Sequence, residues 1–526
     1  MQAQTMQFKD YEVHAGVFAV RTPDRPAIVL ADNNRIVTFA QYEAKSNQVA
    51  HLLRSLGLNR GDRIAIYMEN NAEYLMLAWG ALRTGLRVTA VATHLSPGEI
   101  DYILSDSGAL VLFTSEAMAE SATELKAEGI RNNCRFMLGD VAPGFANLEA
   151  ALDRQPSEPV SEQSEGIEML YSSGTTGRPK AVRKPLPELP FGQPPPSYQS
   201  FADIYGVDEN TIYFHPSPLY HAAPLLGHLR VIRFGGCCVI TQKFDAESAL
   251  TLMDQHHVTH TQWVPTHFVR LLRLPPEVRE HFEGVHHRVA IHAAAPCPVE
   301  IKQQMLDWWG PIIFEYYGGS EGNGYVAITA AEWLKKRGSV GCAKVGRLRV
   351  CDEQGDEVPI GVEGAVFFED GPKFAYHNDP EKTATAYNKH GWSTLGDIGY
   401  VDQDGYLFLT DRKAFVIVSG GVNIYPQEAE NLLSSHPDII DVAVFGIPDP
   451  EYGEQVKAVV QPVRMDLANK DLERRLLDFC RQHLSNVKCP RSIDFREDLP
   501  RQDNGKLYKQ KLRDQYWSQY NGGIKS

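Results

Sequence analysis

The sequence has little of what marks several classes of protein. Eight of its 526 residues are cysteine, and no two are spaced as Cys-x-x-Cys, which argues against a zinc ribbon or a disulfide framework. No apolar run is long enough to span a bilayer, and the first residues lack the basic start and apolar core of a secretory signal. We therefore expect a reduced, cytoplasmic protein without a transmembrane segment, and contact with a membrane surface stays open.

Positive charge is also scarce. Lys and Arg number 52 against 66 Asp and Glu, and the net charge of −14 argues against a dedicated nucleic-acid surface. A local group of backbone N–H donors can still bind an anion on an acidic protein. Hydrophobic residues make up 43% and charged residues 22%, as in an ordinary globular protein, and the length calls for two or more domains.

Strands alternate with helices in the first part of the chain. Arg63–Tyr67 is typical of a strand, a helix is expected from about Ala72 to Arg83, and Leu86–Val91 follows as another strand. Further on, Asp245 is a suitable N-terminal cap for a helix over Ala246–Gln255. This alternation predicts βαβ units and a parallel sheet.

Two segments depart from this pattern. The proline-rich stretch Lys184–Pro196 cannot form a regular element and is expected to be a surface excursion. Beyond Asp411–Gly421 a compact α+β unit is expected. Its predicted helices and strands cover residues 427–433, 439–445, 456–463 and 471–482. The chain is therefore expected to form two domains, residues 1–411 and residues 412–526.

The stretch from Tyr171 to Lys180, YSSGTTGRPK, can bury almost nothing. Its hydroxyl groups and free backbone N–H groups suit a polyphosphate, its glycines allow close approach of the backbone, and Lys180 adds positive charge. The spacing does not fit a Walker A loop, G-x-x-x-x-G-K-[ST]. Taken alone, the stretch could equally be a flexible turn.

The loop is not alone, because the chain from about Pro23 to Lys506 resembles the acyl-adenylate-forming superfamily. That family includes acyl-CoA and aryl-CoA ligases, luciferases and the adenylation domains of peptide synthetases. Its loop [YF]-[TS]-S-G-[TS]-[TS]-G-x-P-K-G wraps the ATP phosphates, and Ala181 stands here in place of the last glycine. The resemblance implies catalysis by Thr175 and phosphate binding by Ser172, Ser173, Gly174, Thr175, Thr176, Gly177 and Lys180.

The resemblance also implies the fold. An α/β protein is expected, with a large N-terminal domain of layered β-sheets and helices and a small mobile C-terminal α+β domain.

The segment Tyr317–Glu321, YGGSE, is similar to the family motif Y-G-x-[TS]-E. The resemblance implies that Tyr317 lies against adenine, that Gly318 belongs to the ATP site, that Ser320 contacts a phosphate and that Glu321 binds Mg²⁺. An aromatic ring suits a base, and a hard carboxylate suits Mg²⁺. Outside this family the same residues would be read as a glycine-rich turn with a solvated glutamate.

Other motifs complete the expected nucleotide site. Asp397, in a Gly-Asp turn that resembles T-G-D, is implied to accept hydrogen bonds from the ribose hydroxyls, and Arg412 is implied to reach the ribose. Ala294, Ala295 and Pro296 resemble the small-residue loop that packs along adenine. By themselves, a Gly-Asp turn and a lone arginine are commonplace.

His221, in PSPLYHAAP, matches the histidine of the motif P-[LM]-[FY]-H beside the acyl pocket, although a single histidine is more often structural than catalytic. The histidines at 256, 257 and 260 have no Glu or Cys that would complete a metal site, so zinc is not expected there.

The C-terminal motif LPRQDNGK resembles L-P-[RK]-[TN]-x-[TS]-G-K, which makes Lys506 the lysine that enters the site and stabilises charge as the carboxylate attacks phosphorus. Gly420 and Gly421 match the glycines along the route of the thiol. Ala414 and Phe415 replace the polar residues that most relatives carry at the hinge, where any residue that tolerates backbone rotation serves.

The predicted function is that of an ATP-dependent acid–CoA ligase, which uses Mg²⁺, ATP, coenzyme A and a small-molecule carboxylic acid, with no nucleic-acid partner and with a homodimer left open. No carrier domain follows Lys506, which favours a diffusible thiol. The presumed pocket segments are rich in Ala, Gly and Leu, which favours a bulky steroid- or bile-type acid or a medium- or long-chain fatty acid. The alternatives are an aryl-acid CoA ligase, an adenylating enzyme with another acceptor, and a non-catalytic ATP-binding paralogue.

Overall fold

The computed structural model describes residues 9, 12–172, 179–420, 422–501 and 507–521. The chain forms two compact units. The first contains the residues up to Trp263 together with Leu274–Ala290 and Phe374–Pro380, and the second contains Val264–Arg273, Ile291–Lys373 and the residues from Glu381 onward. Both units combine β-sheets with helices, which confirms the predicted α/β class.

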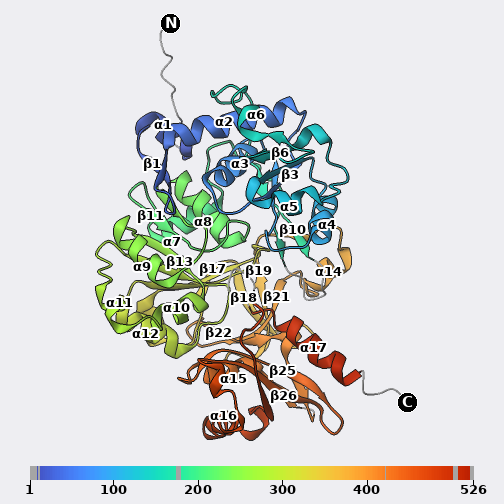
Figure 1. Ribbon diagram of the computed structural model, residues 1–526. Helices are drawn as coiled ribbons and strands as arrows, with labels where there is room; N and C mark the ends of the chain where they lie inside the picture. The colour runs from blue at the N-terminus through green and yellow to red at the C-terminus, as the bar shows by residue number, and fades with distance from the viewer. Residues whose placement is uncertain (1–8, 10–11, 173–178, 421, 502–506, 522–526) are drawn as a thin grey trace. The chain divides into compact units, whose positions relative to one another are not determined.

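Six parallel strands form one sheet of the first unit, in the order β7-β6-β5-β3-β4-β8. Figure 1 labels β3 and β6 of this sheet. Its central strands are buried along nearly their whole length, as in parallel sheets with both faces covered. The strands are β3 (Arg63–Tyr67), β4 (Arg87–Ala90), β5 (Val111–Ser115), β6 (Arg135–Leu138), β7 (Ala146–Asn147) and β8 (Ile167–Glu168). The accompanying helices are α2 (Phe39–Ser55), α3 (Ala72–Leu82), α4 (Pro97–Ser107), α5 (Ala119–Thr123) and α6 (Leu148–Leu152). The predicted βαβ units are confirmed.

Five further strands of the first unit are hydrogen-bonded in the order β13-β11-β12-β1-β2. They are parallel except for the edge strand β2. They are β1 (Pro26–Leu30), β2 (Arg35–Thr38), β11 (Ile212–Phe214), β12 (Cys237–Ile240) and β13 (His260–Trp263). The helices in this part are α1 (Ala15–Arg21), α7 (Pro196–Tyr205), α8 (Ala222–Arg233), α9 (Ala246–Gln255) and α11 (Pro276–His281).

A small antiparallel sheet, β9-β10-β20, holds both ends of the segment 173–178. Its strands are β9 (Tyr171–Ser172), β10 (Lys180–Arg183) and β20 (Ala375–Tyr376). Lys180 is paired in register with Ser172, so the two ends of this segment start from neighbouring strands.

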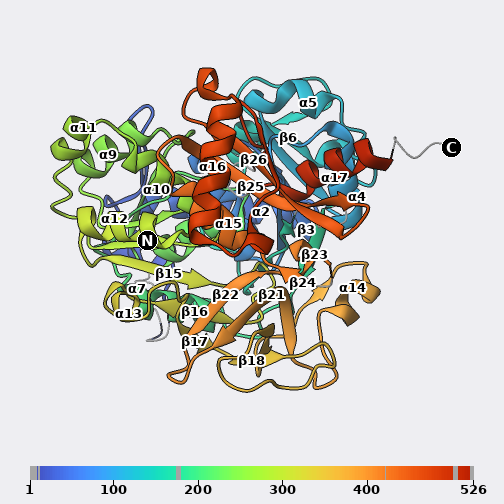
Figure 2. The same ribbon diagram turned by 90° about the horizontal axis from the view of Figure 1, so that it is seen from below.

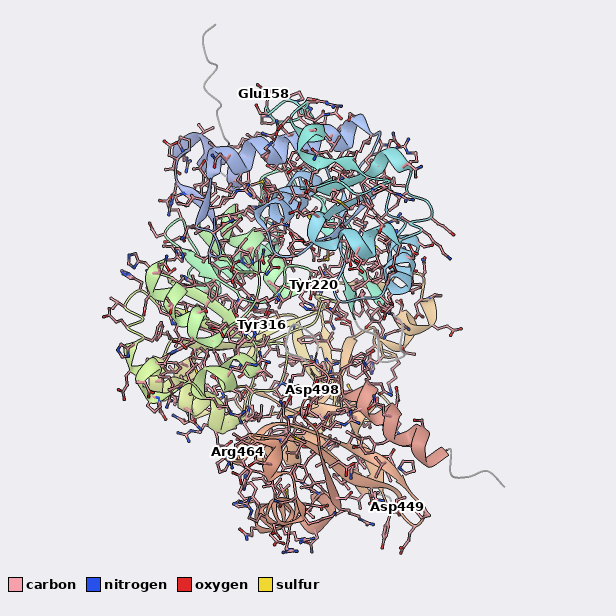
Figure 3. The ribbon with its side chains drawn as sticks, viewed as in Figure 1. Glu158, Tyr220, Tyr316, Asp449, Arg464 and Asp498 are labelled. Atoms are coloured by element: carbon pink, nitrogen blue, oxygen red, sulfur yellow. The ribbon has the colours of Figure 1, made fainter. Side chains whose placement is uncertain are left out.

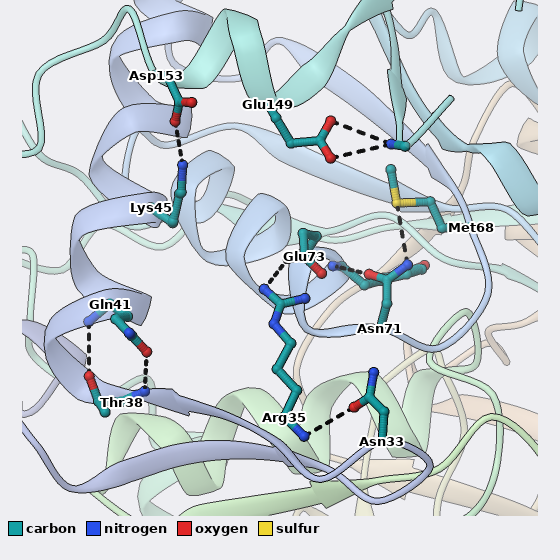
Figure 4. Close-up of polar contacts among 12 residues, drawn as sticks. Asn33, Arg35, Thr38, Gln41, Lys45, Met68, Asn71, Glu73, Glu149 and Asp153 are labelled. Carbon is teal, nitrogen blue, oxygen red and sulfur yellow. Dashed lines mark hydrogen bonds and ion pairs between the residues drawn. The ribbon is translucent and has the colours of Figure 1, made fainter. Parts of the chain in front are cut away.

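Local hydrogen bonds explain where α2 and α3 of the first unit begin (Figure 4). At the start of α2, the Thr38 hydroxyl accepts from the backbone N–H of Gln41, whose side chain accepts in return from the backbone N–H of Thr38. Asn71 caps α3 by accepting from Tyr74 N at 2.7 Å. Each cap joins residues only three positions apart in the sequence, so its cause is local.

In the second unit, β15, β16 and β17 form antiparallel pairs, and a separate antiparallel sheet has the order β18-β19-β21-β22. The first group is β15 (Ile313–Tyr317), β16 (Tyr325–Ile328) and β17 (Cys342–Val345). The second is β18 (Arg347–Cys351), β19 (Gly364–Glu369), β21 (Ser393–Val401) and β22 (Leu407–Arg412). The helices α10 (Pro265–Leu272), α12 (Val299–Trp309) and α13 (Ala330–Lys335) belong here; β14 (Val289–His292) and α14 (Pro380–Thr385) lie at unit boundaries.

The C-terminal residues of the second unit build their own sheet, β24-β23-β26-β25 with β27 beside β26. The helices α15 and α16 lie together over β25 and β26 (Figure 2). The elements are β23 (Ile417–Ser419), β24 (Val422–Ile424), α15 (Pro426–Ser434), β25 (Ile439–Asp449), β26 (Gly453–Pro462), α16 (Lys470–His483), β27 (Ser492–Phe495) and α17 (Lys509–Asn521). The helices and strands predicted for this α+β part are confirmed, and the strands run longer than predicted.

The proline-rich segment is only partly as predicted. It contains no regular element before α7 begins at Pro196, but it does not run freely over the surface. Gly192 is buried and donates its N–H to Glu165 Oε1 at 2.9 Å. The side chains of Arg60 and Arg233 donate to the carbonyl oxygens of Pro187 and Gln193. Contacts from distant residues, which the composition of the segment does not show, hold it in place.

Candidate active site

The residues predicted to bind the nucleoside form a hydrogen-bonded cluster in the second unit. Tyr317, the last residue of β15, donates its hydroxyl to Asp397 Oδ2 at 2.7 Å. The Nε of Arg412 donates to Asp397 Oδ1 at 3.0 Å. Asp397 and Arg412 are register partners on β21 and β22, so the sheet itself places the carboxylate beside the guanidinium.

Asp397 accepts both hydrogen bonds of this cluster. Its side chain is almost fully buried, with 5% of the residue exposed, and the adjacent carboxylate raises the pKa of Arg412. Burial first and then Asp397 raise the pKa of Tyr317 well above its ordinary value, so its hydroxyl keeps its proton. A carboxylate that accepts two hydrogen bonds still has lone pairs for further donors, and vicinal hydroxyls are suitable donors.

Two glycines shape the backbone around the cluster. Gly396 has φ of +83°, a left-handed conformation that favours glycine, and its N–H donates to Thr394 Oγ1 at 2.9 Å. A side chain at Gly319 would meet Glu321 Oε2 at 2.5 Å and Leu395 Cδ2 at 2.7 Å. Leu395, which stands where the family usually has threonine, therefore packs against the YGGSE turn.

Glu321 lies within electrostatic reach of the cluster. Its carboxylate acts on the pKa values of both Tyr317 and Arg412. Ser320, between Gly319 and Glu321, is partly exposed, and Gly318 is exposed. This partly exposed carboxylate lies near the residues predicted to bind the nucleoside. It would suit a Mg²⁺ ion, because this ion prefers hard oxygen ligands and keeps several waters.

The loop predicted to pack along adenine begins beside a buried charge network. Ala294 has φ of +76° and is exposed, as is Pro296, whereas Ala295 is partly buried. His292, the last residue of β14, lies with its Nε2 3.5 Å from Glu315 Oε2. Lys302 on α12 donates to the same Glu315 oxygen at 2.6 Å.

Sequence reasoning missed this network. Lys302 has 1% of its surface exposed and its ammonium lies 4.9 Å from the centre of the Trp333 ring. Burial raises the pKa of Glu315 and, with Lys302 nearby, lowers the pKa of His292 well below its ordinary value. The one available signal was the position of Lys302 on the apolar face of α12, next to Ile301 and one turn from Met305.

The ends of the predicted phosphate loop are firmly held. Lys180 donates to Asp379 Oδ2 at 2.5 Å, and the Tyr171 hydroxyl donates to Asp106 Oδ2 at 2.7 Å. Asn378 also donates to Asp106. Ser172 belongs to β9, whereas Ser173, Gly174, Thr175, Thr176 and Gly177 lie outside the described residues.

His221 is the residue before the first turn of α8, and its ring centre lies 4.6 Å from that of Tyr220, which Figure 3 labels. Its side chain does not cap the helix. This leaves the imidazole at the helix N-terminus, where the helix dipole favours a negative group such as a carboxylate.

The residues around the predicted hinge make contacts of their own. The Phe415 ring lies 5.2 Å from the Lys509 ammonium, which also pairs with Glu430 at 2.7 Å. Arg513 reaches the carbonyl oxygen of Ala414. Phe415 therefore packs against α17, a contact that an aspartate at this position could make only as an ion pair.

The thiol route and the catalytic lysine are described only in part. Gly420 has φ of +58°, and its N–H donates to the Tyr452 carbonyl oxygen at 2.8 Å. Gly421 and Lys506 lie outside the described residues. Of the predicted site residues, the structure thus brings together Tyr317, Glu321, Asp397 and Arg412.

Comparisons with known proteins place the chain in a family. Residues 17–373 match the AMP-binding enzyme family, and residues 428–506 match the AMP-binding enzyme C-terminal domain. The chain belongs to the AMP-binding enzyme family. The resemblance to acyl-adenylate-forming enzymes and the predicted fold are thereby confirmed.

Relatives and solved structures cover nearly the whole chain. The chain is 29% identical over 503 residues to a long-chain-fatty-acid–CoA ligase, FadD13, of Mycobacterium tuberculosis, covering 95% of this chain and 97% of that protein. It is 31% identical over 482 residues to a feruloyl-CoA synthase of an Amycolatopsis species, covering 91% and 93%. The crystal structure of ATP-bound MatB from Rhodopseudomonas palustris superposes with a TM-score of 0.81 at 27% identity, covering 96% of this chain and 100% of that one.

Family and relatives together establish the reaction class. This AMP-binding enzyme is an ATP-dependent, AMP-forming acid–CoA ligase that acts through an acyl-adenylate and uses ATP, Mg²⁺ and coenzyme A. Within the described part of the chain, we find no helix with the length and apolarity needed to cross a membrane.

His260 is one of the three histidines at which zinc is not expected. Both of its ring nitrogens form hydrogen bonds, one with the Thr259 hydroxyl and one with the Tyr205 carbonyl oxygen.

Proposed function

We propose that the substrate is a bulky hydrophobic carboxylic acid, of the steroid or bile type, or a medium- or long-chain fatty acid. The observation that carries this proposal is the abundance of Ala, Gly and Leu in the segments presumed to line the acyl pocket. These segments are His221–Leu226, Trp263–His267, Ala293–Cys297 and Gly318–Gly324. Small side chains leave volume for a large acid, and an apolar lining favours an apolar one. The fatty-acid ligase among the relatives supports the same choice.

A second candidate is an aryl acid. It is favoured by the 31% identity to a feruloyl-CoA synthase. Rings also stack in the YYGGSEGNGY segment, where the centres of Tyr316 and Tyr325 lie 5.1 Å apart at 24°. A planar ring could extend such a stack, whereas a flexible alkyl chain gains less from it.

For the nucleotide, we propose that Tyr317 faces adenine and that Asp397 and Arg412 bind the ribose hydroxyls. The 2.7 Å and 3.0 Å hydrogen bonds within this cluster support the assignment, because they hold the carboxylate ready for further donors. Ala294, Ala295 and Pro296 are proposed to line adenine with Gly318. Phosphate is assigned to residues 172–177, Lys180 and Ser320, and Mg²⁺ to Glu321.

For catalysis, we propose that Lys506 stabilises the charge that develops as the carboxylate attacks the α-phosphorus, with Thr175 and His221 also in the catalytic set. Residues 412–526 are proposed to form the domain that moves between adenylation and thioester formation. Their separate core supports this division: Ile417, Val444, Val460, Leu476 and Ile493 belong to one buried cluster. Gly420 and Gly421 are proposed to line the path of the thiol.

The test is a panel of acids assayed with ATP, Mg²⁺ and coenzyme A. AMP release and thioester formation would be measured for short-chain, long-chain, aryl and steroid acids. We expect the highest kcat/KM with long-chain or steroid acids, and a strict preference for benzoates or cinnamates would refute the proposed substrate.

A further inference from the structure

Four arginines gather near the starts of β3 and β4 in the first unit. Arg63 and Arg87 are the first residues of the parallel strands β3 and β4 and are register partners, so their backbones are neighbours. Arg60 precedes β3 in the chain, and Arg183 ends β10. We call these four residues the arginine cluster.

The segment that follows β10 ties the cluster together. Arg87 Nη1 donates to the Lys184 carbonyl oxygen at 2.9 Å, and Arg60 Nη2 donates to the Pro187 carbonyl oxygen at 2.8 Å. Lys184 directly follows Arg183, so this segment brings Arg183 to the starts of β3 and β4. Carbonyl oxygens satisfy guanidinium donors but do not neutralise their charge.

Within the described part of the chain, Arg63 and Arg183 lack even such partners. Among the described residues, neither Arg63 nor Arg183 has a side-chain hydrogen bond or an ion pair, and the Nε of Arg63 is buried without an acceptor. The Nη1 of Arg63 lies near Gly108, just past the end of α4, where the helix dipole favours a cation without cancelling its charge. Arg183 is exposed.

The nearby carboxylates already accept hydrogen bonds from other side chains. The charge of Glu168 favours the charged form of Arg87, but Glu168 also accepts a hydrogen bond from the Lys184 ammonium at 2.7 Å. Asp106 accepts hydrogen bonds from Tyr171 and Asn378. Burial, followed by the charges of Arg183, Arg63 and Arg60, lowers the pKa of Arg87, which shows that these like charges act on one another. In a chain of net charge −14, an unneutralised group of four arginines opposes folding.

We propose that the arginine cluster is a binding site for a phosphate group, carried by a small phosphomonoester or by a lipid headgroup. Planar guanidinium forks match phosphate oxygens in pairs, and a dianion would neutralise charge that no ion pair among the described residues neutralises. The site differs from the phosphate loop predicted for ATP. Lys180 and Arg183 are three residues apart on β10, and side chains at an odd spacing along a strand point to opposite faces.

The proposal does not rest on the ligase function, and it can be tested without turnover. Inorganic phosphate and glycerol 3-phosphate would be titrated into the full-length protein by calorimetry at constant ionic strength. We expect Arg183→Ala to weaken binding roughly tenfold, the loss of about one charge-assisted hydrogen bond. The double variant Arg63→Ala/Arg183→Ala should remove measurable binding, and Arg183→Lys should restore part of it, because lysine keeps the charge but not the fork.

Two control variants locate the ion. Arg154 is an exposed arginine elsewhere in the first unit, and Arg154→Ala should leave binding unchanged. Lys180→Ala should also retain binding. If Lys180→Ala abolishes the titration while Arg63→Ala/Arg183→Ala preserves it, phosphate binds at the predicted ATP loop and the proposal is overturned. Arg183 is exposed, so Arg183→Ala gives a result even if the double variant does not fold.

A parallel arm identifies the source of the phosphate. Cosedimentation with vesicles of phosphatidic acid in phosphatidylcholine would be compared with vesicles of phosphatidylcholine alone. Cosedimentation that Arg63→Ala/Arg183→Ala abolishes, together with a silent titration, assigns the site to a lipid headgroup and supports the anion site. Binding in neither arm overturns it.

Discussion

Tyr317 and Asp397, eighty positions apart in the chain, are joined by a hydrogen bond of 2.7 Å from the phenol to Oδ2 of the carboxylate. The bond links the end of β15 to β21, and Arg412 completes the arrangement from β22. The hydrogen bond joins the YGGSE motif to the Gly-Asp motif, which were recognised separately in the sequence. A change in either residue is therefore expected to affect how a nucleoside binds to the other.

Removing the phenol tests this coupling. Tyr317→Phe keeps the ring but loses the donor to Asp397, and we expect the KM for ATP to rise roughly tenfold, the usual effect of one hydrogen bond to a charged group. The KM for coenzyme A should stay close to that of the wild type. Steady-state kinetics with each substrate varied in turn give both values, and an unchanged KM for ATP would show that the hydrogen bond does not serve nucleotide binding.

The buried network beside the small-residue loop should control stability. Lys302→Met leaves the Glu315 carboxylate buried without its ammonium partner, and we expect a loss of about 3–5 kcal/mol in the free energy of unfolding. The double variant Lys302→Met/Glu315→Gln removes both charges and should recover most of that loss. Urea unfolding of the three proteins measures the coupling, and equal losses in the single and double variants would contradict it.

Acid should destabilise the protein through buried neutral histidines. Burial, with Arg83 and Arg233 nearby, lowers the pKa of His14 from 6.5 to about 3. As pH falls below 6.5, the unfolded state binds a proton that the folded state does not, so stability is lost through this window by up to about 1.4 kcal/mol per pH unit for this residue.

His14→Asn provides the matched comparison. His14 caps α1 by accepting from Gly16 N at 3.1 Å, and asparagine is also a good N-cap. The variant should lose the titrating group while keeping the cap, so its stability should fall less steeply between pH 6.5 and pH 4. Thermal melts across this range decide the matter, and parallel curves for the two proteins would rule out a contribution from His14.

Replacing Lys506 should affect the two half-reactions, adenylation and thioester formation, to different extents. If it stabilises the developing charge at phosphorus, Lys506→Ala should lower the adenylation rate by about two orders of magnitude or more. Thioester formation from synthetic acyl-AMP should be largely spared. Pyrophosphate exchange measures the first step and thioester release the second, and equal losses in both would argue for a structural role instead.

Much of the secondary structure could be predicted because its causes are local. Asp245 accepts from Ser248 N three residues on, and α9 covers Ala246–Gln255 as expected. Ser96 and Glu99 form the capping box at the start of α4. Such bonds close within one helical turn, so neighbouring residues suffice to specify them.

From the sequence alone, the class of enzyme and several of the helices and strands could be predicted, because each motif and each helix cap lies within a few neighbouring residues. Which distant charges meet depends on the fold: Lys302 pairs with Glu315, Lys180 with Asp379, and the arginines at the starts of β3 and β4 lie near the end of β10. The order of strands in a sheet sets these encounters, and a side chain's burial and charge balance depend on all the segments packed around it.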